Sequence, residues 1–207
     1  MNLQLALDRL TRDECFLLLK KTEASVDWIE VGTGVIKEYG MAIVREIKAA
    51  YPEKVVVADM KTCDAGKHET IQAFEAGADI TTVMAFSADK TILDTLQVAK
   101  EYDKRVMIDL LGVKDRDRLV ELQNLGVDLV SLHYGKDMQL EGEMGANLFA
   151  LTKGLQNLEV AVAGGINLAS LPEVVENQPD TVIVGSAITK AENPNEAAAT
   201  MKGMLLK

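Results

Sequence analysis

The chain has 207 residues, of which 48% are hydrophobic but only 4% aromatic, and its formal net charge at pH 7 is -10. This length allows one sizeable core built from small and branched side chains, and the acidic balance without a basic block argues against a nucleic-acid partner. No apolar run approaches the roughly 20 residues of a membrane span, no signal-peptide pattern opens the chain, and the two cysteines lack metal-site spacing, so we expect a cytoplasmic protein without membrane association.

Short apolar runs alternate along the chain with longer segments of helical spacing, a pattern typical of repeated βα units. Segments 75–79 ("EAGAD") and 124–128 ("NLGVD") share one arrangement, in which a glycine ends a helix and an Asp precedes the next strand. Residues 193–206 predict a closing helix, with Asn193 as its cap and Pro194 in its first turn. The eight predicted strands are 3–8, 26–32, 54–61, 79–85, 105–112, 128–135, 159–165 and 180–186.

Eight strands alternating with eight helices predict an α/β protein, a (β/α)8 TIM barrel that forms one compact domain over residues 1–207. A doubly wound open sheet is the structural alternative. That fold normally has fewer strands and a glycine-rich turn after the first one. Here the first strand ends in "LDRL" (7–10), without glycine, which favours the barrel.

Polar side chains stand at the ends of several predicted strands, where barrels of this type carry their chemistry. Because residues two apart share a face of a strand, the apolar neighbours of each polar residue fix its direction. The alternation places Leu3, Leu5 and Leu7 against the helices. The polar residues predicted to point into the barrel are Gln4, Asp8, Glu30, Asp59, Lys61, Asp109 and His133. Each alone could be a solvated loop residue, but the set predicts a site.

Four carboxylates gathered in one barrel mouth require compensating positive charge. Lys61 supplies one cation. A hard divalent cation is the natural second, because Mg²⁺ binds one or two carboxylates together with substrate oxygens and water. We expect Glu30 and Asp59, on neighbouring strands, to be its ligands, with Mn²⁺ as a possible substitute.

The last two strands end in small residues, in "VAGGIN" (162–167) and "IVGSAIT" (183–189). Backbone N–H groups exposed at the start of a helix bind anions without a basic side chain. Barrels of this type often bind a substrate phosphate after strands seven and eight. Turn glycines are a plainer explanation of either segment alone, but their occurrence after both strands predicts a phosphate site.

With these residues identified, the motif Asp59–Lys61–Asp64 resembles the Asp-x-Lys-x-x-Asp signature of the orotidine 5'-monophosphate decarboxylase suprafamily. Within that suprafamily the chain most resembles the 3-hexulose-6-phosphate synthases, which are aldehyde-lyases. The likeness runs from "LQLALD" (3–8) through "IEVGTGVIKEYG" (29–40) and "ADMKTCDAG" (58–66) to "VIVGSAI" (182–188), nearly the whole chain.

The resemblance implies Mg²⁺-dependent aldol addition of formaldehyde to D-ribulose 5-phosphate, giving D-arabino-hex-3-ulose 6-phosphate, and the reverse reaction. It implies that Lys61 stabilises an enediolate, that His133 handles the proton and that Asp8 organises the site. It further implies a homodimer in which Asp64 reaches the active site of the neighbouring subunit. By the same resemblance, Glu30 and Asp59 bind the metal, and the phosphate is held by Gly164, Gly165, Gly185 and Ser186.

Two alternatives remain open from the sequence. The related 3-keto-L-gulonate 6-phosphate decarboxylases also form an enediolate, but usually have Glu at the position of Asp109 and Arg at that of Lys136. The synthases share the Asp, although they more often have Thr where this chain has Tyr134. The second alternative is a catalytically silent barrel that binds sugar phosphates, for which an inward Lys and His would be unnecessary.

Overall fold

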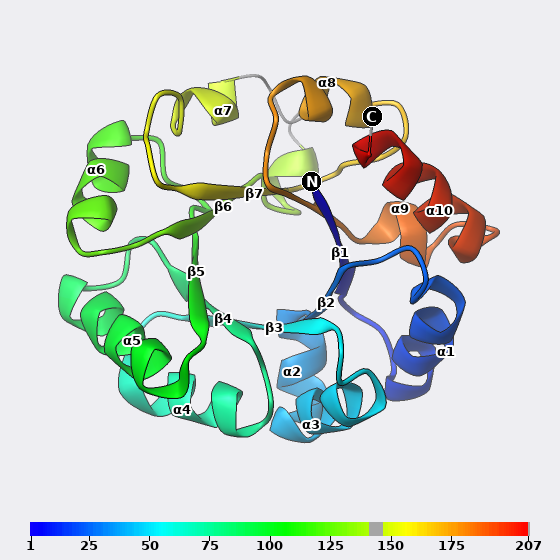
Figure 1. Ribbon diagram of the computed structural model, residues 1–207, viewed down its shortest axis with the longest axis horizontal. Helices are drawn as coiled ribbons and strands as arrows, with labels where there is room; N and C mark the ends of the chain where they lie inside the picture. Colours follow the sequence, from blue (N-terminus) through cyan, green and yellow to red (C-terminus); the bar gives the residue numbers. More distant parts are fainter. Residues whose placement is uncertain (141–146, 207) are drawn as a thin grey trace.

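The computed structural model describes residues 1–140 and 147–206 of the chain. Eight parallel strands pair in sequence order, and β8 also pairs with β1, so the sheet closes into a barrel. The helices surround the barrel (Figure 1), and the predicted (β/α)8 fold is confirmed. The strands are β1 (Asn2–Leu7), β2 (Trp28–Val31), β3 (Val55–Thr62), β4 (Ile80–Met84), β5 (Arg105–Asp109), β6 (Leu129–His133), β7 (Glu159–Ala163) and β8 (Thr181–Val184).

Two connections contain a second helix that the prediction of one helix per strand did not include. Between β2 and β3, the helices α2 and α3 meet at Gly40, whose φ of 63° ends the first helix in a conformation that favours glycine. The other pair, α9 and α10, follows β8. The helices are α1 (Arg12–Thr22), α2 (Thr33–Tyr39), α3 (Met41–Ala50), α4 (Gly66–Glu75), α5 (Asp89–Tyr102), α6 (Arg116–Asn124), α7 (Asn147–Ala150), α8 (Leu171–Glu176), α9 (Ser186–Thr189) and α10 (Pro194–Leu205).

The predicted signals at helix ends are confirmed in the structure. Gly77 and Gly126 both have positive φ, and each lies between a helix and the following strand. At the start of α10, the Asn193 side chain accepts a hydrogen bond from the backbone N–H of Glu196, and Pro194 occupies the first turn. These local signals fix where the βα units begin and end.

The core has two layers, separated by the sheet. Leu3, Leu5 and Leu7 are fully buried between the sheet and the helices, as their alternation predicted. A smaller cluster fills the inside of the barrel, and it consists of Val57, Ile80, Met107, Leu129, Ala161 and Ile183. Side chains therefore plug the barrel and leave only the mouth at the strand ends for a ligand.

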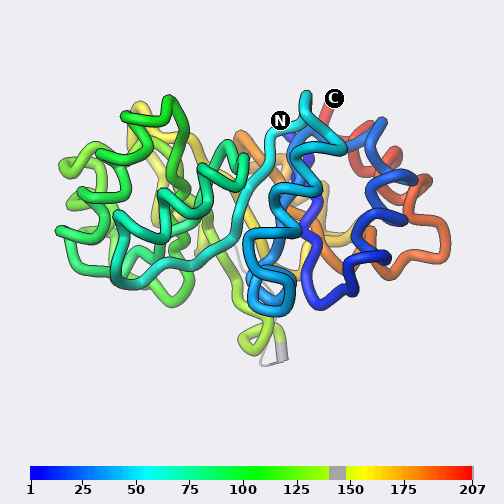
Figure 2. Tube along the Cα trace, turned by 90° about the horizontal axis from the view of Figure 1, so that it is seen from below, coloured from blue at the N-terminus to red at the C-terminus, as the bar shows by residue number. Residues whose placement is uncertain are grey.

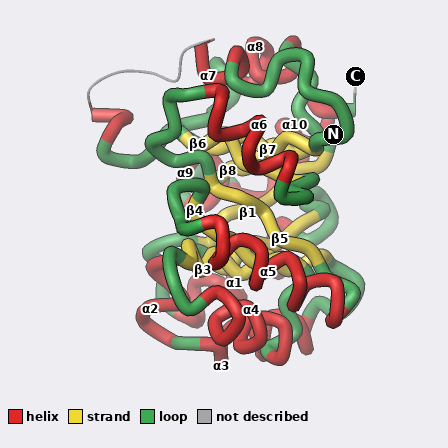
Figure 3. The backbone as a smooth tube through the Cα atoms, turned by 90° about the vertical axis from the view of Figure 1, so that its left-hand side faces the viewer, coloured by secondary structure: helices red, strands yellow, loops and turns green. Residues whose placement is uncertain are grey.

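The carboxyl ends of the strands lie on the face opposite the two chain termini (Figure 2). On this face the segment after β6, which includes the short 3-10 helix η1 (Met138–Leu140), projects beyond the body of the barrel. Figure 3 shows the same segment standing out from the side, while the strands stay enclosed by helices. Over residues 1–140 and 147–206, no helix has the length and apolar character needed to cross a lipid bilayer.

Candidate active site

A cavity of about 460 Å³ opens at the carboxyl ends of the strands, where the sequence predicted the chemistry to lie. The structure brings nearly all of the predicted site residues to its wall. Asp64 is the exception among them: it lies past the end of β3, is exposed and does not line the cavity. The predicted residues that do line it are Asp8, Glu30, Asp59, Lys61, Asp109, His133, Gly164, Gly165, Gly185 and Ser186.

Asp109, at the end of β5, is a carboxylate held by three groups of the site. Its Oδ2 atom lies 2.6 Å from Nζ of Lys61 and 2.9 Å from Nδ1 of His133, and its Oδ1 accepts the backbone N–H of Leu111 at 2.8 Å. Burial alone would raise the pKa of Asp109, but the hydrogen bond and charge of His133, together with Lys61, lower it to about 2. Asp109 is therefore ionised at neutral pH, and it fixes both the Lys61 ammonium group and the His133 ring.

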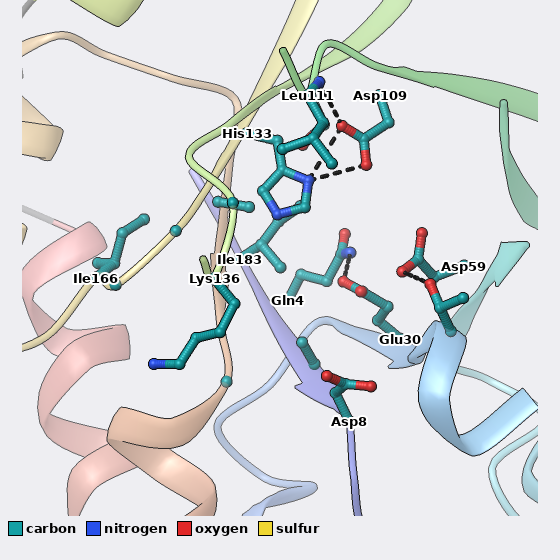
Figure 4. Close-up of a pocket in the computed structure, with 18 of the residues that line it drawn as sticks. Gln4, Asp8, Glu30, Asp59, Asp109, Leu111, His133, Lys136, Ile166 and Ile183 are labelled. Carbon is teal, nitrogen blue, oxygen red and sulfur yellow. Dashed lines mark hydrogen bonds and ion pairs between the residues drawn. The ribbon is translucent and has the colours of Figure 1, made fainter. Parts of the chain in front are cut away.

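This contact decides which nitrogen of His133 faces the cavity. An ionised carboxylate accepts hydrogen bonds, so the Nδ1 atom beside Asp109 carries a hydrogen. In the neutral ring Nε2 then keeps its lone pair. Figure 4 shows this second ring nitrogen turned away from Asp109. His133 is thus oriented to take a proton from a ligand in the cavity.

Lys61 lies in an irregular part of β3. Between Ala58 and Thr62 the pairing with β4 shifts, and the backbone φ of Lys61 is 48°, in the left-handed region. Its ammonium group contacts Asp59 at 3.1 Å as well as Asp109. Burial opposes the charge of Lys61, but the two carboxylates outweigh this effect and raise the pKa of the ammonium group. Lys61 therefore stays protonated.

Asp59 is held from three sides. Its Oδ2 accepts a hydrogen bond from the Thr33 hydroxyl at 2.6 Å, and its Oδ1 accepts one from the Thr82 hydroxyl at 2.8 Å, besides the contact with Lys61. Thr33 opens α2, so this helix is tied directly to the site. Asp59 is 6% exposed, and these donors stabilise its charge in the absence of bulk water.

Glu30, on β2, lies near Asp59, and fewer hydrogen-bond donors stabilise its charge than that of Asp59. The side-chain amide of Gln4 donates to its Oε2 at 2.5 Å (Figure 4). Burial, together with the charge of Asp59, raises the pKa of Glu30 to about 8. A second cation beside Glu30 and Asp59 would favour the ionised form of Glu30 and relieve this repulsion.

These residues fit a hard divalent cation by the chemistry of their donors. Glu30 and Asp59 offer carboxylate oxygens. Gln4, which is fully buried and lines the same cavity, has an Oε1 atom without a hydrogen-bond partner among the described residues. Within that part of the chain, no three His, Cys, Asp or Glu side chains gather into a metal-binding group. Mg²⁺ needs only one or two carboxylates with water and ligand oxygens, so this set suits Mg²⁺ or Mn²⁺.

Asp8 follows β1 and lies at the rim of the cavity. Its Oδ1 accepts the backbone N–H of Gly34 at 3.1 Å, and its Oδ2 lies 3.2 Å from Nε of Arg9. A side chain at position 34 would bring its Cβ to 2.7 Å from that Asp8 oxygen, so the contact requires glycine. Asp8 thereby links the end of β1 to the first turn of α2.

The predicted phosphate residues lie together along one wall, after β7 and β8. Gly164 has a φ of 124°, and a Cβ at this position would lie 2.3 Å from the carbonyl oxygen of Tyr134, so no other residue fits. As glycines, Gly164, Gly165 and Gly185 contribute only backbone atoms to this wall. Three basic side chains also line the cavity, Arg9, Lys136 and Lys190, and they add positive charge that the backbone-only prediction did not include.

Several lining residues were missed by the sequence analysis. Thr82 occupies an inward position two residues after Ile80, so alternation along β4 could have identified it. Ser131 lies two residues before His133 on β6, so alternation could have identified it in the same way. Thr33 and Lys190 lie in or after helices, where alternation carries no information about direction.

Known proteins are similar to this chain over nearly its whole length. A model described as the orotidine 5'-phosphate decarboxylase / HUMPS family matches residues 1–201. A curated relative from Bacillus subtilis, named 3-hexulose-6-phosphate synthase, is 42% identical and aligns over 100% of both chains. The crystal structure of a protein of that name from Salmonella typhimurium is 38% identical, with a TM-score of 0.97 over 100% of this chain and 99% of the other.

A structure named for the decarboxylase reaction is also similar. The 3-keto-L-gulonate-6-phosphate decarboxylase from Vibrio cholerae shares 28% of its residues with this chain, with a TM-score of 0.85. The match covers 99% of this chain and 96% of the decarboxylase. Proteins named as synthases and as decarboxylases thus share this barrel. The identity to this chain is 38–42% for the two synthases and 28% for the decarboxylase.

Proposed function

Because this chain belongs to the orotidine 5'-phosphate decarboxylase / HUMPS family, and within it to the 3-hexulose-6-phosphate synthases, we propose that it adds formaldehyde to D-ribulose 5-phosphate. Synthases of this name are aldehyde-lyases, so the chain is an enzyme that forms and breaks a carbon–carbon bond. The proposed product is D-arabino-hex-3-ulose 6-phosphate. The observation that carries the proposal is the joint attachment of Lys61 and His133 to Asp109.

His133 is the proposed base. Its Nε2 removes the C1 proton of ribulose 5-phosphate, and the electron pair moves onto the C2 oxygen to give an enediolate. C1 then attacks the carbon of formaldehyde, a carbon–carbon bond forms, and the formaldehyde oxygen takes up a proton. An imidazole ring can accept a proton in one step and return it in the next, and His133 returns it to the formaldehyde oxygen.

Lys61 is the proposed electrostatic partner of the enediolate. Its ammonium group is fixed by Asp59 and Asp109, which use two of its three hydrogens and leave one for a ligand. A positive charge held in place before the reaction stabilises the developing oxyanion without further rearrangement. An alkyl or neutral side chain at this position could not do so.

Mg²⁺ is the proposed cofactor, with Mn²⁺ as a substitute. Glu30 and Asp59 would hold it, and the burial and carboxylate repulsion that raise the pKa of Glu30 support a cation at this point. When bound, the ion would act as a Lewis acid toward the carbonyl oxygen of the sugar. The protein's own contribution is to hold the two carboxylates, through Gln4, Thr33 and Thr82.

The phosphate of the substrate is proposed to lie against Gly164, Gly165, Gly185 and Ser186. The glycine backbone after β7 and β8 supports this placement, together with Lys190 on the same wall. The phosphate would then lie on the wall formed by β7 and β8, with the reactive end of the sugar toward Lys61 and His133. Such two-point binding would orient C1 toward the base.

A homodimer with shared active sites is also proposed. Asp64 is exposed and lies outside the cavity of its own chain, which supports a role at a partner's site. We also keep the cytoplasm as the proposed location. Mixing inactive Asp64 and Lys61 variants tests the shared-site homodimer.

A second candidate function is the decarboxylation of 3-keto-L-gulonate 6-phosphate. It is supported by the structural similarity to the Vibrio cholerae protein and by the basic side chain of Lys136 at the cavity. Both reactions pass through a similar enediolate, so the Lys61 and His133 arrangement serves either.

Product analysis separates the two functions. The purified protein is offered ribulose 5-phosphate with formaldehyde, and separately 3-keto-L-gulonate 6-phosphate, each with Mg²⁺. We expect rapid formation of the hexulose 6-phosphate and slow or undetectable release of carbon dioxide. Efficient release of carbon dioxide without hexulose 6-phosphate would assign the chain to the decarboxylase reaction.

A further inference from the structure

Thr82 lies in the middle of β4 and is the one hydroxyl that contacts both residues of the Asp59–Lys61 pair among the described residues. Its Oγ1 accepts the backbone N–H of Lys61 at 2.9 Å and donates to Oδ1 of Asp59 at 2.8 Å. The side chain is 4% exposed and lines the cavity. Because the hydroxyl has one hydrogen, which it donates to Asp59, its oxygen is left to accept the Lys61 N–H.

The irregular pairing of β3 explains why Lys61 needs this partner. From Ala58 to Thr62 the chain advances four residues, while the paired residues on β4 advance only two, from Thr81 to Val83. Such a bulge removes residues from the ladder and leaves their N–H groups without strand partners. The N–H of Lys61 points instead at the Thr82 side chain.

The positive φ of Lys61 adds to this requirement. A non-glycine residue at φ 48° is strained and persists only where its surroundings hold it. The bulge, with this backbone conformation, brings Nζ of Lys61 to 2.6 Å from Asp109 on β5. Loss of the Thr82 bond would let the bulge relax and move the ammonium group away from its place.

We propose that Thr82 is a positioning residue that couples the Lys61 backbone to the Asp59 carboxylate and so holds the cation and the metal ligand in register. This inference rests on the proposed function for its kinetic consequences, but not for its geometry. Thr82 does not need to touch the substrate. It acts through the two residues on which it makes its hydrogen bonds.

The chain offers a matched control in the preceding residue. Thr81 lies on the same strand, is fully buried and donates from its hydroxyl to the carbonyl oxygen of Ala58 at 3.3 Å, away from the cavity. Thr81→Val removes a buried hydroxyl of the same kind from the same strand. Thr82→Val removes it from the site, and Thr82→Ser keeps the hydroxyl but deletes the methyl group.

Kinetics with ribulose 5-phosphate and formaldehyde form the first arm of the test. We expect Thr82→Val to lower kcat by about 10- to 100-fold, as for other residues that orient site ligands, with KM for ribulose 5-phosphate little changed because the phosphate wall is untouched. Thr82→Ser should recover most of the activity, and Thr81→Val should retain it. The proposal is overturned if Thr82→Ser loses as much kcat as Thr82→Val. It is also overturned if Thr81→Val loses as much kcat as Thr82→Val.

Hydrogen exchange of the Lys61 backbone amide, followed by NMR, forms the second arm and needs no substrate. The amide should be protected in the wild type, Thr82→Ser and Thr81→Val, and exposed in Thr82→Val. If the Lys61 amide exchanges rapidly in Thr82→Val while that variant keeps the wild-type kcat, the proposal is overturned. If Thr82→Val does not fold, Thr82→Ala takes its place, since it leaves room for water.

A third arm separates this inference from the proposed function. If the wild type does not convert ribulose 5-phosphate, the proposed reaction is wrong. The effect of the Thr82 substitution is then measured as Mn²⁺ affinity, by electron paramagnetic resonance. Weaker Mn²⁺ binding in Thr82→Val than in Thr81→Val would support the coupling to Asp59. Equal binding in both variants would contradict it.

Discussion

Lys61 and Asp109 form an ion pair across an intervening strand: Nζ of Lys61 on β3 lies 2.6 Å from Oδ2 of Asp109 on β5, with β4 between them. The same oxygen contacts Nδ1 of His133 on β6 at 2.9 Å. One carboxylate therefore fixes the cation that would stabilise an oxyanion and the imidazole that would move the proton. The relative placement of these two groups depends on Asp109.

Asp109→Asn should lower kcat about 10- to 100-fold, because the neutral amide holds Lys61 and His133 less firmly. The substitution keeps the shape of the side chain but removes its charge. Steady-state kinetics with ribulose 5-phosphate and formaldehyde measure the effect. Asp94→Asn is the control, since among the described residues Asp94 forms an ion pair only with Lys90 on the surface of α5. Equal kcat values for the two variants would show that Asp109 does not organise the site.

The low pKa of Asp109 predicts how stability depends on pH. Its pKa is about 2 in the folded protein against 3.8 for the unperturbed group, so the charged form is favoured by folding. The contribution is complete above pH 3.8 and is lost as the pH falls through 2. The difference corresponds to about 2 kcal/mol in the free energy of unfolding.

Urea unfolding of the wild type and Asp109→Asn, at pH values from 2 to 6, measures this contribution. We expect a constant difference in the free energy of unfolding above pH 4 that narrows toward pH 2. A difference that stays constant down to pH 2 would show that Asp109 is not stabilised in its charged form.

Metal dependence follows from the proposed role of Glu30 and Asp59. Activity should disappear with a chelator and return with Mg²⁺ or Mn²⁺. Glu30→Gln should weaken Mn²⁺ binding about 10- to 100-fold, since it removes a charged ligand. Glu101→Gln, on the exposed face of α5, is the matched control. Full activity of metal-stripped protein would refute the cofactor.

The shared-site dimer is tested by mixing inactive subunits. Asp64→Asn and Lys61→Ala should each be inactive alone. If Asp64 serves the partner's cavity, a heterodimer contains one site with both native residues, and refolding the variants together should restore part of the activity. Heterodimers that form but remain inactive, while each variant is folded, would exclude a shared site.

Much of this site could be predicted because apolar neighbours fix the direction of polar residues on a strand. Glu30 lies between Ile29 and Val31, and Asp109 follows Ile108, so alternation alone points both into the barrel. The register and bulge of β3 could not be predicted, because they depend on pairing with β4. The Lys61–Asp109 contact and the role of Thr82 follow from that bulge, and sequence alternation does not show them.

The division of the β2–β3 connection into α2 and α3 was also missed. Gly40 alone is ambiguous in sequence, since a glycine within a helical pattern can be tolerated or can end the helix. Only the φ of 63° shows that the chain turns there. This turn matters for the site, because α2 presents Thr33 to Asp59.

The central claim is that His133, held by Asp109, removes the C1 proton of ribulose 5-phosphate before formaldehyde arrives. NMR of ribulose 5-phosphate in heavy water with enzyme and Mg²⁺, without formaldehyde, measures this step alone. The wild type should exchange the C1 proton for deuterium, and His133→Ala should do so about 10²–10⁴-fold more slowly. His68→Ala, on α4, outside the cavity, should match the wild type. Wild-type protein that shows no exchange, yet decarboxylates 3-keto-L-gulonate 6-phosphate efficiently, would contradict the account.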